Sequence, residues 1–155
     1  MLHEIHMFIV WHQAISFFEY IIDTIASKLE IIDAIHFTCN KSRAITIQQK
    51  LYNISFEEAR EKCESNNFED FIIIIVRLER SIYVTTSTHW GIAKVEKHMY
   101  MIKNTLRKEL NIPFCIHSTI SKEEAERDIP LMTGKTTSYY IDHPLWDKMT
   151  KEIIL

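Results

Sequence analysis

The sequence predicts an α+β fold in one domain that spans residues 1–155. Short apolar runs of strand length alternate with segments in which apolar residues recur every three or four positions. Isoleucine is abundant, and β-branched side chains favour strands and a stiff core. A chain of 155 residues is within the usual size of one domain, and its two glycines and three prolines make long flexible linkers unexpected.

Two strands alternate with helices in the first part of the chain. Residues 13–29 carry apolar side chains at helical spacing. Ser55, with Glu58 three residues later, has the spacing of a capping box and predicts a helix start. The expected elements are a strand at 5–11, a helix at 13–29, a strand at 30–39, a loop with a short helix at 40–53, and a helix from Ser55 to about Cys63.

The second part predicts a central strand followed by a hairpin. Residues 71–76 are apolar on both faces, as in a covered strand, and the β-rich run at 81–88 is close enough to pair with them. A second capping box begins at Ser121, and Gly134 predicts the end of the helix that it starts. The expected elements are strands at 71–76 and 81–88, a helix at 92–110, a strand at 114–120, and a helix from about Lys122.

Charge and composition narrow the classes of partner. The formal net charge is −3, whereas a large nucleic-acid footprint needs a basic surface. No signal peptide and no apolar run of membrane-span length are apparent. We therefore expect a cytoplasmic protein that binds neither long nucleic acid nor a membrane; its oligomeric state stays open.

Two short motifs, His36-Phe37-Thr38 and His117-Ser118-Thr119, follow apolar runs that predict strands. Because residues i and i+2 of a strand share a face, each histidine projects beside its own threonine. Two such pairs facing one pocket would supply two imidazoles and two hydroxyls, which can move protons around a phosphodiester. The alternative is that both histidines are partly buried strand residues and both threonines ordinary strand formers.

With these motifs the chain resembles the two-histidine phosphoesterase superfamily, which is marked by a pair of His-x-Thr/Ser motifs on strands. The resemblance implies a bilobal α+β fold, with sheets around a central cleft and helices packed outside. It implies a metal-independent phosphodiesterase, a hydrolase of a small cyclic or oligomeric nucleotide, with no cofactor. His36 and His117 would serve as acid and base, and Thr38 and Thr119 would donate hydrogen bonds to phosphate oxygens.

Cations and aromatic rings elsewhere could hold such a nucleotide. Lys103 and Arg107 are four residues apart in an expected helix, so they share a face and could bind phosphate. Aromatic side chains could stack on the base. The expected substrate-binding residues are Trp11, Tyr83, Lys103, Arg107 and Tyr139.

Metal and thiol chemistry have less support in the sequence. His3, Glu4 and His6 are close together, but the two histidines would point to opposite faces of a strand, so we expect exposed polar residues and no metal site. The three cysteines have no paired spacing, which is typical of reduced, mostly buried thiols.

A second resemblance favours a different class of function. The chain is similar to a bacterial domain associated with surface-polysaccharide genes at residues 71–76, 85–87, Lys103, Arg107, 117–121, Asp128 and Gly134. In that domain the position of His36 is not histidine. This resemblance implies a non-catalytic accessory domain that binds a nucleotide or a sugar phosphate.

Overall fold

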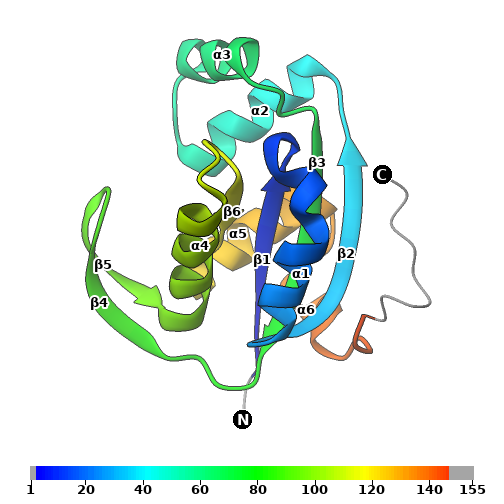
Figure 1. Cartoon of the computed structure of the whole chain (residues 1–155), viewed down its shortest axis with the longest axis vertical. Helices are drawn as coiled ribbons and strands as arrows, with labels where there is room; N and C mark the ends of the chain where they lie inside the picture. The colour runs from blue at the N-terminus through cyan, green and yellow to red at the C-terminus, as the bar shows by residue number, and fades with distance from the viewer. Residues whose placement is uncertain (1–2, 147–155) are drawn as a thin grey trace.

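The protein is built on a four-stranded antiparallel sheet. The computed structural model describes residues 3–146 (Figure 1). The strands lie in the order β2–β3–β1–β6. They comprise β1 (Glu4–Trp11), β2 (Glu30–Thr38), β3 (Asp70–Leu78) and β6 (Ile116–Ser118).

The connections between these strands give the split βαβ order of ferredoxin-like folds. β1 and β2 run parallel, and β3 lies between them antiparallel to both. Likewise β6 is antiparallel to β1 and thus parallel to β3. The connecting helical segments are η1 (His12–Phe17) and α1 (Phe18–Ala26) after β1, and α4 (Lys97–Leu110) before β6.

Further elements are added to this frame. A separate two-stranded hairpin precedes α4 and extends to one side of the sheet (Figure 1). Two helices are inserted between β2 and β3, and two follow β6. These elements are α2 (Lys41–Tyr52), α3 (Phe56–Ser65), β4 (Tyr83–Thr88), β5 (Gly91–Glu96), α5 (Lys122–Thr133) and α6 (Thr137–Ile141).

Helices cover both faces of the sheet, which explains why its central strands are almost entirely apolar. Alternate residues of β1 enter two separate cores: Ile9 and Trp11 belong to one, and Phe8 and Val10 to the other. Buried side chains of α2, α3, α5 and α6 form the first core with one face. Those of α1 and α4 form the second core with the opposite face.

The α+β class, the strands and the helix caps predicted from the sequence are confirmed. Ser55 accepts a hydrogen bond from the backbone N–H of Glu58, and Ser121 from that of Glu124. Gly134 ends α5 with a φ of 72°, which a residue without Cβ adopts at little cost. Within residues 3–146, no helix combines the length and the apolar character of a membrane span.

Several element boundaries were wrong. Residues 41–52 form a full helix, α2, because Asn40 caps it and its apolar residues face the core. Residues 91–96 form β5 rather than the start of a helix, and 81–88 contribute the partner strand of β5 instead of pairing with β3. The expected helix at 13–29 begins as a 3₁₀ segment and becomes α-helical only at Phe18.

A buried hydrogen-bonded chain ties β1 to β6 and to the hairpin. His6 is fully buried, with Nδ1 3.0 Å from Thr119 Oγ1 and Nε2 3.0 Å from Glu4 Oε2. Thr119 Oγ1 also accepts from the backbone N–H of Met7, and Tyr83 donates its hydroxyl to Glu4. A neutral ring with its proton on Nε2 satisfies every one of these contacts. The expectation that His6 is an exposed polar residue was therefore wrong.

We predict that Thr119→Val lowers the free energy of unfolding by about 1–3 kcal/mol, because it leaves the Met7 N–H and the His6 ring without their partner. Urea denaturation measures this change. Thr46→Val is the matched control: among the described residues, the Thr46 hydroxyl bonds within its own helix, to the Ser42 carbonyl, and the expected change is within about 0.5 kcal/mol. Equal effects of the two variants would contradict the structural role of Thr119.

Candidate functional site

The two histidines of the repeated motif lie on opposite faces of the sheet. His36 pairs with Ile72, whose side chain enters the core under α1 and α4. His117 pairs with Ile9, whose side chain enters the other core. Directly paired residues share a face, so the two imidazoles project in opposite directions.

The two histidines also lie on opposite edges of the sheet. β2 and β6 are its two outer strands, with β3 and β1 between them. Three strand spacings of roughly 4.8 Å separate them by about 14 Å. Both imidazoles therefore cannot reach one phosphate, and the expected pocket shared by His36, Thr38, His117 and Thr119 is wrong. One sheet with its two outer strands carries the motifs, rather than two lobes around a cleft.

The first motif forms a polar cluster at one end of the sheet. Thr38 is exposed opposite Asp70, whose carboxylate accepts hydrogen bonds from His36 and, at 3.0 Å, from Nδ1 of His12. Partial burial acts to raise the pKa of Asp70, but the hydrogen bonds from His36 and His12 outweigh it and lower that pKa. The Asp70 carboxylate thereby links β3 to β2 and to η1.

The second motif is buried and differs from the first in every contact. His117 is 7 % exposed, and its ring meets the Tyr52 ring edge-on at 5.2 Å. Its Nε2 has no hydrogen-bond partner among the described residues. Thr119 is fully buried and already bonded to His6 and Met7. The hydroxyl of Thr119 is thus a structural group in this conformation.

Four cations from three helices surround His117. Burial is the main cause that lowers the pKa of His117 to about 3, and the positive charges act in the same direction. The imidazole is consequently neutral at physiological pH. The cations are Lys62 on α3, Lys103 and Arg107 on α4, and Arg127 on α5.

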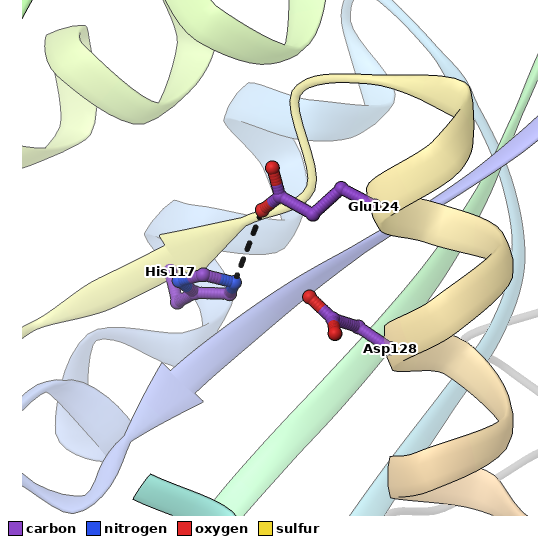
Figure 2. A group of neighbouring side chains, drawn as sticks. All are labelled: His117, Glu124 and Asp128. Carbon is purple, nitrogen blue, oxygen red and sulfur yellow. Dashed lines mark ion pairs between the residues drawn. The ribbon is translucent and has the colours of Figure 1, made fainter. Parts of the chain in front are cut away.

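Two carboxylates of α5 complete the surroundings of His117 (Figure 2). Glu124 Oε1 lies 3.8 Å from His117 Nε2, and Asp128, fully buried, receives hydrogen bonds of 2.6 and 3.0 Å from Arg127. Burial raises the pKa of both carboxyl groups. Sequence reasoning missed this pair, although their spacing of four residues places them on one helix face.

An open cavity of about 380 Å³ lies next to His117, at the end of β6 where the chain enters it. Its aromatic lining includes Tyr52 and Phe114, and two cations, Lys62 and Arg107, also line it. Lys62 Nζ lies 4.1 Å from the centre of the Tyr52 ring and 5.4 Å from that of Phe114. Burial lowers the pKa of Lys62. The remaining lining residues are Trp11, Ile112, Pro113 and Ile116.

Arg107 is fixed at the rim of this cavity by the outer edge of the sheet. Its Nε and Nη2 donate to the carbonyl of Ile116, at 3.1 and 2.9 Å. Lys103 stands one turn earlier on α4, and burial together with the charge of Arg107 lowers its pKa to about 8. Lys103 and Arg107 thus lie one turn apart on α4, but Arg107 lines the cavity and Lys103 does not.

The other expected substrate-binding residues do not gather there. Trp11 lines the cavity but is 1 % exposed, because it packs edge-on against Phe68 and Phe71 in the core, so its ring face is not open for stacking. Tyr83 lies on the hairpin and donates to Glu4, and Tyr139 lies on α6 beside Tyr140. Neither of these two tyrosines lines the cavity.

Comparisons with known proteins give little further guidance. No protein-family model matches the chain, and no curated protein matches it. A crystal structure of an NDP kinase from Pyrobaculum aerophilum is similar at a TM-score of 0.49 and 11% sequence identity, over 90% of this chain and 99% of that chain. At that level the similarity carries no information about activity.

The resemblance to two-histidine phosphoesterases is corrected by these findings. No family model supports it. The sheet register independently separates the two motifs that suggested it.

We predict that the His117 ring does not titrate between pH 8 and pH 5, because its pKa is lowered from 6.5 to about 3. NMR chemical shifts of the ring measure this directly. As the pH falls below 6.5, His117 binds a proton in the unfolded chain but stays neutral in the folded protein. The free energy of unfolding is therefore unaffected by the ionisation of His117 above pH 6.5. Between pH 6.5 and pH 3 it falls with decreasing pH, by at most about 1.4 kcal/mol per pH unit. A titration midpoint near 6.5 would contradict the buried, cation-surrounded environment.

Proposed function

We propose that the chain binds a small nucleotide in the cavity between β6, α2, α3 and α4. The observation that carries this proposal is the meeting of an aromatic surface with two cations, Lys62 and Arg107, in one open cavity. A volume of about 380 Å³ is within the range of ligand pockets. A nucleotide supplies both an aromatic base and an anionic phosphate, which is the chemistry that such a lining complements.

Phe114 and Tyr52 offer the surface for the base. Phe114 is 49 % exposed although it is a large apolar residue, and its ring lies 6.0 Å from that of buried Phe68. Its φ of 53° is rare for a bulky residue, and such backbone strain is concentrated at ligand sites. Stacking of a base on a ring of this kind contributes about 1–3 kcal/mol.

Lys62 and Arg107 offer the charges for the phosphate. Lys62 is partly buried against aromatic rings, so its ammonium group is poorly solvated and gains from an anionic partner. Arg107 uses two N–H groups for the Ile116 carbonyl, and a guanidinium has five. Its forked donors suit phosphate oxygens.

Size and charge favour a short ligand over a polymer. The chain carries a net charge of −3, and affinity for long nucleic acid depends on the number of phosphates that are neutralised. One or two contacts within the open cavity suffice for a mono- or dinucleotide. The proposed function is binding: a reaction shared between His36 and His117 does not enter it, because these residues lie on opposite faces.

The direct test is isothermal titration of the full chain with AMP, GMP and a cyclic dinucleotide, beside glucose 6-phosphate and a 30-mer RNA. We expect a nucleotide to bind more tightly than either of the last two. Lys62→Gln should weaken that binding by about 10- to 100-fold, as expected for loss of a charged hydrogen bond.

Lys108→Gln is the matched control, because Lys108 is an exposed neighbour of Arg107 on α4 that does not line the cavity. It should leave the affinity unchanged. Tighter binding of glucose 6-phosphate than of any nucleotide would contradict the nucleotide proposal and would indicate that the cavity binds a sugar phosphate. Tighter binding of the RNA, or equal effects of the two lysine variants, would overturn it.

A further inference from the structure

We propose that His117, Glu124 and Asp128 form a binding site for a divalent transition-metal ion, with Zn²⁺ as the ion that the donor set fits best. Each residue offers one ligand atom, and these atoms all lie within 4.8 Å of one another. In Figure 2 the imidazole points from the strand towards the two carboxylates of the helix. The site lies beside the nucleotide cavity but uses none of its lining residues.

The three ligands come from two elements that the fold holds together. Glu124 and Asp128 are one turn apart on α5, and Ala125 and Ile129 of the same helix are buried in the core beside β1. His117 lies on β6, which pairs with β1, and its side chain is on the face that α5 covers. Sites built on packed strands and helices keep their geometry better than sites on loops.

The unpartnered nitrogen of His117 points independently to a ligand. The side chain is more than nine-tenths buried, and no described residue forms a hydrogen bond with Nε2. The nearby Glu124 oxygen, at 3.8 Å, is too distant to form one. Buried polar atoms without partners are rare in native proteins, and an ion at this position would supply the missing partner.

The donor set and its spacing suit zinc. An imidazole nitrogen and two carboxylate oxygens are ordinary zinc ligands, at about 2.0–2.2 Å from the metal. In a tetrahedral site such atoms stand about 3.4 Å apart, so the observed spacing of at most 4.8 Å needs a contraction of up to about 1.4 Å. Glu124 is partly exposed and can rotate to make it. Three protein ligands leave a fourth position open, as in catalytic zinc sites.

Arg127 holds the third ligand in place. It donates to both carboxylate oxygens of Asp128, at 2.6 and 3.0 Å, and each oxygen retains a further lone pair for a metal. Outer partners of this kind orient metal ligands in many sites. The two carboxylates also offset the charge of a divalent ion, which four nearby cations would otherwise oppose.

The test is titration of the EDTA-stripped full chain with ZnCl₂, followed by calorimetry, and with CoCl₂, followed by the visible absorption of four-coordinate cobalt. We expect a single ion per chain and a rise in melting temperature with zinc. Glu124→Gln, which changes a partly exposed side chain without changing its size, should weaken binding by about tenfold or more. Asp128→Asn should do the same. Glu123→Gln, at an exposed neighbouring position, should have no effect.

A second control addresses the competing cluster at the other end of the sheet. His12, His36 and Asp70 also bring imidazoles to a carboxylate, so zinc bound there would be lost in His12→Ala. We expect His12→Ala to retain the tight site. Loss of binding in His12→Ala with retention in Glu124→Gln would overturn the proposal, as would the absence of binding by the wild-type chain. No nucleotide is present in this experiment, so its result is independent of the nucleotide proposal.

Discussion

The alternation of side chains along the strands of a sheet covered on both faces determines where the two His-x-Thr motifs lie. Because Ile9 and Phe8 enter different cores, any residue paired with one is separated from any residue paired with the other by the full thickness of the sheet. His117 pairs with Ile9 and lies on the same face as Ile9. His36 pairs with Ile72 and lies on the opposite face. The two His-x-Thr motifs therefore occupy unrelated environments, one buried beneath α5 and one in a polar cluster beside η1.

Charged side chains from two helices lie next to the outer strand β6, which is only three residues long. Arg107 extends from α4 on one side to the Ile116 carbonyl, and Glu124 approaches His117 from α5 on the other. Tyr52 links the two regions, since it lines the cavity and also contacts the His117 ring. The proposed nucleotide site and the proposed metal site are thus adjacent but made of different side chains, which allows them to be examined separately.

Local signals in the sequence predicted the elements well. The apolar run of β3 and the serine caps of α3 and α5 depend on neighbours within a few residues, and these were confirmed. The faces of His36 and His117 could not be predicted in this way, because they depend on strand order and on which helices cover each face. The carboxylates Glu124 and Asp128 had a readable helical spacing, but its significance depends on His117, which only the tertiary structure brings to them.

The central claim is that the cavity at the end of β6 is the ligand site, and NMR mapping tests it most directly. Backbone amide shifts of the labelled full chain would be followed during titration with AMP. The account predicts that the largest changes fall on Ile112, Phe114 and Ile116, with Lys62 and Tyr52 next to them. Changes centred on His36, Asp70 and His12, or spread evenly over the surface, would contradict it.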